Sequence, residues 1–175
     1  MKKPTYEMII EALKRVDHSL KTYYLGEYPY PLASGNCGLA ALAISRVLND
    51  YGINHHFHII TTTDFDENPC PDTWELARDY QTTPDHISVI MREGYVDYSF
   101  GDKDEIDNFM DEHEEYHGQC EFVDINDHHL PDLRDYVLEN TTCWMDDGEE
   151  IIYESLTHEL QKIIDLTPSY ATMTA

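Results

Sequence analysis

A glycine-flanked cysteine stands where an irregular segment gives way to a run of small apolar residues. The stretch reads Ser34-Gly35-Asn36-Cys37-Gly38-Leu39-Ala40-Ala41-Leu42-Ala43-Ile44. With Gly52 as a natural stop, it predicts a buried helix from Cys37 to about Asp50. The helix dipole favours the thiolate of a cysteine at its N-terminus, and the glycines at 35 and 38 let another group approach the sulfur. The stretch therefore predicts a nucleophile, and the alternative is that Cys37 is an inert packing residue.

The charge balance restricts the partners of the chain. The sequence has 35 acidic and 11 basic residues and a net charge of −24. A surface of this kind repels phosphate backbones and anionic membranes, so we expect neither nucleic-acid nor membrane binding. It favours a neutral or basic peptide or protein as substrate, and it leaves open the binding of a basic protein partner.

Length and cysteine spacing predict a single domain in a reducing compartment. The 175 residues, 41% of them hydrophobic, suffice for one domain over 1–175, with an N-terminal helix and loop over 1–30 and a flexible tail over 168–175. No Cys-x-x-Cys pair occurs, so we expect neither a structural metal site nor a cofactor. No signal-peptide pattern is present, and no apolar run approaches the ~18 residues of a spanning helix, which favours a cytoplasmic protein with free thiols.

Hydrophobic periodicity predicts a mixture of helices and strands. Helices are expected over 4–22, 37–50, 74–80, 103–117, 130–138 and 149–166, strands over 54–61, 87–91, 95–100 and 120–125, and a long loop over 62–72. Pro4 is expected in the first turn of its helix. In the first strand, Phe57 and Ile59 are expected on one face, and His56 and His58 on the other. A hairpin around residues 92–94 completes an α+β fold with an antiparallel sheet.

A cysteine nucleophile needs a base to take its proton and a group that orients the base. His86 in the first hairpin strand is the candidate base, and Asp97 in the second is the candidate orienting group. If Ile90 pairs with Tyr95, these two side chains share a face as diagonal neighbours, about 7–8 Å apart between Cα atoms. A slip of one residue places them on opposite faces. A catalytic triad therefore predicts this register, through a four-residue loop over 91–94 or an equivalent bulge.

The combined pattern resembles the papain-like cysteine peptidases. The stretches that carry the resemblance are Gly35-Asn36-Cys37-Gly38-Leu39-Ala40-Ala41-Leu42-Ala43-Ile44 and Asp50-Tyr51-Gly52-Ile53. They are similar to the cysteine helix of the bacteriocin-processing peptidase domains of export transporters. His86 before an apolar strand and Asp97 before Gly101 are similar to the histidine and aspartate strands of those domains. The resemblance covers the region from residue 30 to residue 101 and implies a papain-like fold, with the cysteine helix packed on an antiparallel sheet.

The resemblance also implies a thiol protease, or more broadly a hydrolase or acyl transferase for an amide, thioester or ester. Cys37 would attack the carbonyl carbon, His86 would carry the proton and Asp97 would orient His86. Family members usually have a glutamine shortly before the cysteine as an oxyanion donor, and Pro31 stands at that position here. The backbone N–H of Cys37 and the side-chain amide of Asn36 are the remaining oxyanion-binding candidates. Loss of one donor costs ~10²–10³ in rate, so a slow or inactive enzyme is also compatible with the sequence.

Two other functions remain open. The segment His113-Glu114-Glu115-Tyr116-His117 matches His-Glu-x-x-His, in which two histidines one turn apart bind zinc and the glutamate acts as a base. A zinc peptidase would use His113 and His117, with Asp135 or Glu139 as a third ligand. The acidic composition supports the other function, a non-catalytic inhibitor that mimics nucleic acid and binds a basic protein. Replacement of Cys37 by Ala would inactivate a cysteine hydrolase and leave such a mimic intact.

Overall fold

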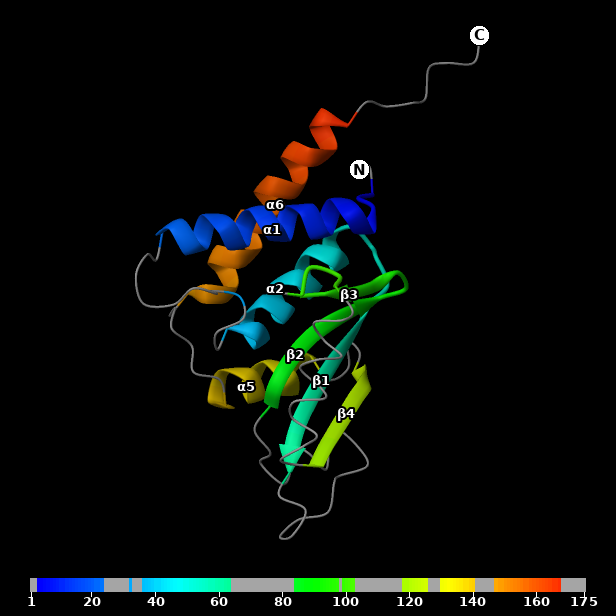
Figure 1. Ribbon diagram of the computed structural model, residues 1–175, viewed down its shortest axis with the longest axis vertical. Coiled ribbons are helices and arrows are strands. Elements are labelled where there is room, and N and C mark those ends of the chain that lie inside the picture. Colours follow the sequence, from blue (N-terminus) through cyan, green and yellow to red (C-terminus); the bar gives the residue numbers. More distant parts are fainter. Residues whose placement is uncertain are drawn as a thin grey trace.

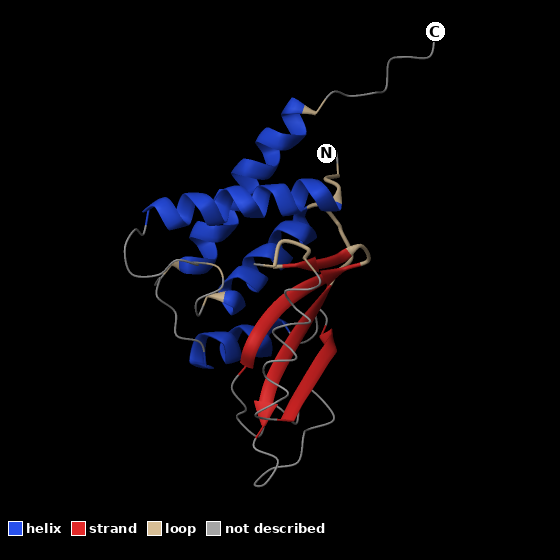
Figure 2. Cartoon of the chain, in the orientation of Figure 1, coloured by secondary structure: helices blue, strands red, loops and turns tan. Residues whose placement is uncertain are grey.

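The computed structural model describes residues 3–23, 32, 36–63, 84–97, 99–102, 118–125, 130–140 and 147–167. Its elements, in chain order, are α1 (Tyr6–Tyr23), α2 (Cys37–Asp50), β1 (His56–Thr63), β2 (Pro84–Met91), β3 (Gly94–Val96), β4 (Gly118–Ile125), α5 (Leu130–Asn140) and α6 (Gly148–Leu166). The strands form an antiparallel sheet in the order β3-β2-β1-β4 (Figures 1 and 2). The α+β prediction is confirmed. The helices expected over 74–80 and 103–117, and the tail over 168–175, lie outside the described residues.

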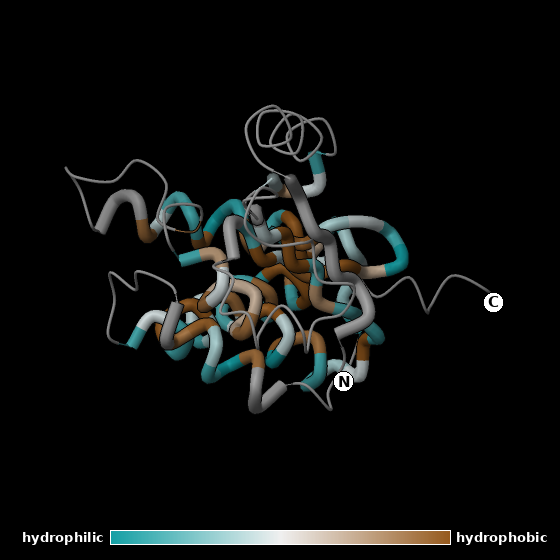
Figure 3. The backbone as a smooth tube through the Cα atoms, turned by 90° about the horizontal axis from the view of Figure 1, so that it is seen from below, coloured by the Kyte–Doolittle hydropathy of each residue, from teal (hydrophilic) through white to brown (hydrophobic). Residues whose placement is uncertain are grey.

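Helix α2 occupies the centre of the helical layer. It packs against β2 on one side and α6 on the other, and α1 packs against α6 (Figure 1). A helix that is enclosed in this way must be apolar on most of its surface. The side chains of α2 are accordingly buried from Cys37 to Ser45, and again at Val47 and Leu48. Figure 3 shows the same segregation, with the hydrophobic stretches of the chain in the interior.

The predicted stop of α2 at Gly52 is confirmed. Gly52 has a φ of +61°, a left-handed conformation that suits a residue without Cβ. Its N–H donates to the carbonyl of Asn49 and the N–H of Ile53 donates to the carbonyl of Leu48, each at 2.9 Å. This pair of hydrogen bonds is a Schellman motif, which satisfies carbonyls that the helix itself leaves without donors.

The start of α1 differs slightly from the expectation. The helix begins at Tyr6, and the Thr5 hydroxyl accepts a hydrogen bond from the N–H of Met8 at 3.4 Å. Thr5 is therefore the N-cap. Pro4 precedes the cap and does not lie in the first turn. The apolar face of the helix is in the core, where Ile9 and Leu13 are completely buried.

The hairpin between β2 and β3 has the register that the triad requires. Ile90 pairs with Tyr95, as predicted, and the pairing extends to Met91 with Gly94. The loop is therefore only the two residues between them, shorter than the predicted loop over 91–94 but in the same register. The strand expected over 95–100 is wrong in its second half, because β3 ends at Val96 and a tight turn follows it.

The first strand has the expected length but lies two residues later in the chain, because β1 begins at His56 and continues to Thr63, into the segment predicted as a loop. Among the helices in the described ranges, none has the length and apolar character needed to cross a membrane.

Candidate functional site

Cys37 is the first residue of α2 and is almost buried, with 9% of its surface exposed. Asn36 is the N-cap residue, and its carbonyl accepts the N–H of Ala40 at 2.8 Å. The Asn36 side chain makes no capping hydrogen bond. The N–H of Cys37 lies in the first turn of the helix, where backbone N–H groups have no acceptor within the helix. The sulfur is therefore placed at the positive end of the helix dipole, as the sequence predicted.

Gly38 has a different role from the one expected. A Cβ atom at this position would lie 2.7 Å from Cγ1 of Val137 in α5 and 3.4 Å from Cδ1 of Ile87 in β2. The absence of a side chain thus allows α5 and β2 to pack against the start of α2. What lies close to Gly38 is the protein's own core, and Gly35 lies outside the described residues.

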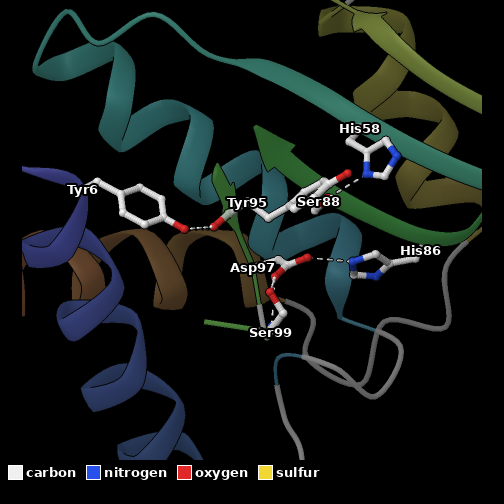
Figure 4. A network of polar contacts seen from close by, with 7 residues as sticks. All are labelled: Tyr6, His58, His86, Ser88, Tyr95, Asp97 and Ser99. Atoms are coloured by element: carbon white, nitrogen blue, oxygen red, sulfur yellow. Dashed lines mark hydrogen bonds and ion pairs between the residues drawn. The ribbon is translucent and has the colours of Figure 1, made fainter. Parts of the chain in front are cut away.

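His86 and Asp97 form a buried ion pair. The Nε2–H of His86 donates to Oδ2 of Asp97 at 2.9 Å (Figure 4). His86 is 2% exposed and Asp97 is 5% exposed. His86 belongs to β2, and Asp97 directly follows β3, so the predicted hairpin register is what brings the imidazole and the carboxylate together.

The thiol of Cys37 is hydrogen-bonded to the His86 side chain. Since Nε2 faces Asp97, the ring nitrogen on the side of the thiol is Nδ1. The backbone N–H groups of Ile87 and Gly38 also lie within hydrogen-bonding reach of the sulfur. The structure thus brings together the three residues that the sequence singled out, in the order Asp97, His86, Cys37.

These contacts lower the pKa of the Cys37 thiol and raise the pKa of His86, and both changes favour the charged forms. Burial by itself raises the pKa of the Cys37 thiol, but the hydrogen bond to His86 and the charge of that ring outweigh it, so the net pKa is lowered. Burial lowers the pKa of His86, but the hydrogen bonds to Asp97 and Cys37 raise it to about 9. Both shifts favour the pair of thiolate and imidazolium over the neutral pair, relative to the two groups in isolation.

Ser99 belongs to the site and was not singled out by the sequence analysis. Its backbone N–H and its hydroxyl both donate to Oδ1 of Asp97, at 2.9 and 2.5 Å (Figure 4). An aspartate that accepts the N–H two residues ahead forms an Asx turn, which Asp, Ser and Gly commonly build. The sequence signal is the run of Asp97, Ser99 and Gly101, and residues 97–100 belong to the strand expected over 95–100.

Tyr6 of α1 is a second residue that the sequence analysis placed only in an apolar helix face. Its hydroxyl donates to the backbone carbonyl of Tyr95 at 2.7 Å, across 89 residues of sequence (Figure 4). Cβ atoms added at Gly94 and Gly101 would lie 3.0 and 2.6 Å from that hydroxyl oxygen. Tyr6 therefore contacts both ends of the segment that carries Asp97.

The oxyanion-binding candidates are the side-chain amide of Asn36 and the backbone N–H of Cys37. Asn36 is 3% exposed and directly precedes Cys37. The backbone N–H belongs to Cys37 itself, and the Asn36 amide belongs to the residue directly before it. Pro31, which occupies the position of the family glutamine, lies outside the described residues.

A small pocket adjoins Cys37. Its volume is about 10 Å³, and its lining includes Leu13, Leu32, Ala41, Ile87 and Asp97. That is room for about one water molecule.

The described residues contain no group of three or more His, Cys, Asp or Glu side chains placed to hold a metal ion. His56 is exposed and His58 is buried, and neither belongs to such a group among the described residues. Nδ1 of His58 lies 3.3 Å from the Ser88 hydroxyl (Figure 4). The zinc-peptidase segment 113–117 lies outside the described residues.

Comparisons with protein-family models, with curated proteins and with solved structures find no match to this chain.

Proposed function

We propose that this protein is a cysteine-dependent hydrolase or acyl transferase that acts on an amide, thioester or ester. Cys37 is the nucleophile, His86 is the general base and acid, and Asp97 orients His86. The observation that carries the proposal is the continuous line of contacts from Asp97 through His86 to a thiol at a helix N-terminus. A lone buried cysteine needs neither an imidazole partner nor a carboxylate behind it.

In the proposed reaction, the Cys37 thiolate attacks the substrate carbonyl carbon and a carbon–sulfur bond forms. The backbone N–H of Cys37 and the amide of Asn36 bind the resulting oxyanion. The imidazolium of His86 then gives its proton to the leaving amine, thiol or alcohol as the bond to the carbonyl carbon breaks. Neutral His86 next takes a proton from water, or from an acceptor amine or alcohol, which attacks the thioester and restores the thiol.

Asp97 contributes by stabilising the imidazolium and by fixing the orientation of the ring. Its Oδ2 atom binds Nε2, so Nδ1 faces the sulfur. This division of the two ring nitrogens is what proton exchange with the thiol requires. A carboxylate buried at this position is otherwise costly, which supports a functional reason for its presence.

We also propose that the arrangement is papain-like in the finer sense. The supporting features are a cysteine at the start of a buried helix, a histidine on the adjacent strand and an aspartate directly after the next strand. The net charge of −24 favours a neutral or basic peptide or protein as the substrate.

Alkylation with iodoacetamide near pH 7, followed by mass spectrometry of all four cysteines, tests this proposal without knowledge of the substrate. We expect Cys37 to react faster than Cys70, Cys120 and Cys143, because its thiolate is stabilised. His86→Ala should remove the advantage of Cys37, and Ser45→Ala, which removes a buried hydroxyl elsewhere on α2, should retain it. Equal, slow alkylation of all four cysteines would overturn the proposed activity.

The acidic composition supports a second proposal, a non-catalytic inhibitor that presents carboxylates to a basic protein. Cys37→Ala separates the two functions: it eliminates hydrolysis and leaves the binding of a basic protein unchanged. A zinc peptidase through His113 and His117 predicts a third pattern, in which a chelator inactivates the protein and a thiol reagent does not.

A further inference from the structure

We propose that Ser99 is a positioning residue that selects which oxygen of Asp97 faces His86. This inference rests on the proposed function, because it concerns the same triad. The carboxylate of Asp97 has its two oxygens divided between two partners: Oδ2 accepts from His86, and Oδ1 accepts both donors of Ser99. Nothing in the family resemblance assigns a role to Ser99.

The division of the two oxygens between partners restricts the rotation of the Asp97 carboxylate. The terminal torsion of an aspartate side chain is broad and roughly two-fold, so it does not by itself fix the plane of the carboxylate. Rotation of the Asp97 carboxylate away from Nε2 would break two hydrogen bonds to Ser99 at the same time. The pair of donors therefore holds Oδ2 in the position from which it binds His86.

A tight turn after β3 brings Ser99 into place. The N–H of Phe100 donates to the carbonyl of Asp97 at 3.1 Å, and the N–H of Asp102 donates to the carbonyl of Ser99 at 2.9 Å. Phe100 has a φ of +53°, in the left-handed region that bulky residues rarely adopt, and Gly101 follows at +80°. Strained residues of this kind persist where the surroundings hold them and cluster at functional sites.

Tyr6 fixes the same segment from the outside. Its hydroxyl binds the carbonyl of Tyr95, and its ring end lies where a side chain at Gly94 or Gly101 would otherwise stand. Burial raises the pKa of the Tyr6 hydroxyl, and the negative charge of Asp97 raises it further. The Tyr6 side chain therefore lies close to Gly94 and Gly101, which precede and follow Asp97 and Ser99 in the sequence.

Loss of the Ser99 hydroxyl has two opposing effects. It leaves the carboxylate with more negative charge to offer His86, and it releases the constraint on its orientation. Orientation prevails, because a hydrogen bond weakens steeply once its angle falls below about 120°. We therefore expect partial loss of the bond to His86 to weaken proton binding by this ring roughly tenfold.

The test is the pH at which His86 loses its proton, measured by NMR on the full chain with ring-labelled histidine and assigned through His86→Gln. In Ser99→Ala we expect this midpoint to move about one pH unit lower than in the wild type. Ser99→Thr keeps the hydroxyl, so its midpoint should lie close to that of the wild type. The matched control is Ser45→Ala, which removes a buried hydroxyl that binds His55 at 2.7 Å and does not contact Asp97. Its midpoint should equal that of the wild type.

An unchanged midpoint in folded Ser99→Ala would overturn this proposal and leave the triad intact. Should Ser99→Ala not fold, Ser99→Gly removes the same hydroxyl, and the same criterion applies to it. A wild-type protein whose Cys37 shows no selective alkylation would instead overturn the proposed function. The two failures therefore appear in different measurements.

Discussion

His86 and Asp97 meet through a 2.9 Å ion pair in a region from which water is almost excluded. An isolated buried charge is strongly unfavourable, so each member of such a pair depends on the other. The arrangement places a cationic ring next to the Cys37 thiol and a fixed carboxylate on the far side of that ring. Removal of the Asp97 charge should therefore change the reactivity of the Cys37 thiol.

We expect Asp97→Asn to slow the alkylation of Cys37 by iodoacetamide at pH 6 at least about tenfold, since each unit of pKa change alters the thiolate fraction tenfold. The amide keeps the shape of the carboxylate but cannot stabilise the imidazolium. Asp102→Asn is the matched control, because it removes the same charge from an exposed position of the same segment. Equal rates for the two variants would contradict the assigned role of Asp97.

The stability of the protein should depend on pH through the same pair. His86 has a pKa of about 9 in the folded state, against about 6.5 in an unfolded chain. Its contribution to stability is therefore fully present below pH 6.5 and is lost as the pH rises through 9. We expect the excess stability of the wild type over Asp97→Asn to fall by up to about 3 kcal/mol between pH 6 and pH 10. Urea unfolding at several pH values measures this difference, and an excess that stays constant or grows with pH would exclude this role for the pair.

The hairpin was predictable from the sequence, and its register followed from the requirement that His86 and Asp97 share a face. The predicted pairing of Ile90 with Tyr95 is present, although the loop between Met91 and Gly94 is shorter than the predicted four residues. The bounds of α2 were also predictable, since Gly52 is a strong local stop signal. Features of this kind depend on residues that are near one another in the chain.

The rest of the site was not predictable in this way. The residues around Phe100 resemble a strand in composition, and their tight turn depends on the Asp97 carboxylate accepting both donors of Ser99. The contact of Tyr6 with Tyr95 spans 89 residues of sequence, and an aromatic residue in an apolar helix face carries no sign of such a partner. The packing of Val137 onto Gly38 is equally non-local, so Gly38 was misinterpreted as space next to the sulfur.

Gly38→Ala should destabilise the protein. The added methyl group would lie 2.7 Å from Val137 Cγ1, and overpacking of this kind costs about 1–3 kcal/mol. That exceeds the gain of up to about 1 kcal/mol that alanine brings to a helix. Val137→Ala removes the clashing atoms, so the double variant should be more stable than the sum of the two single effects by at least about 0.5 kcal/mol. Strict additivity in urea unfolding would show that the two positions do not touch.

Gly101→Ala tests the contact of Tyr6 with the Asp97 segment. A residue with Cβ at a φ of +80° costs about 1–2 kcal/mol, and its Cβ would lie 2.6 Å from the Tyr6 hydroxyl oxygen. Tyr6→Phe removes that oxygen and one hydrogen bond, at a cost of about 1 kcal/mol. In the Phe background, Gly101→Ala should lose its steric cost and retain only the backbone strain. Equal costs in both backgrounds, measured by thermal or urea unfolding, would place Tyr6 away from Gly101.

Added salt should stabilise this protein, although its described surface contains several ion pairs that salt weakens. Exposed pairs such as Arg46 with Glu150 contribute only about 0–1 kcal/mol each. The net charge of −24 acts over the whole surface, and its self-repulsion destabilises the compact state. Screening of that repulsion should therefore prevail, and the Tm at pH 8 should rise by a few degrees between about 0.02 and 0.5 M NaCl, where the Debye length shortens several-fold. The rise should be smaller at pH 6, because protonation of some of the 10 histidines lowers the net negative charge. A Tm that falls with salt at pH 8 would mean that the local pairs outweigh the global repulsion.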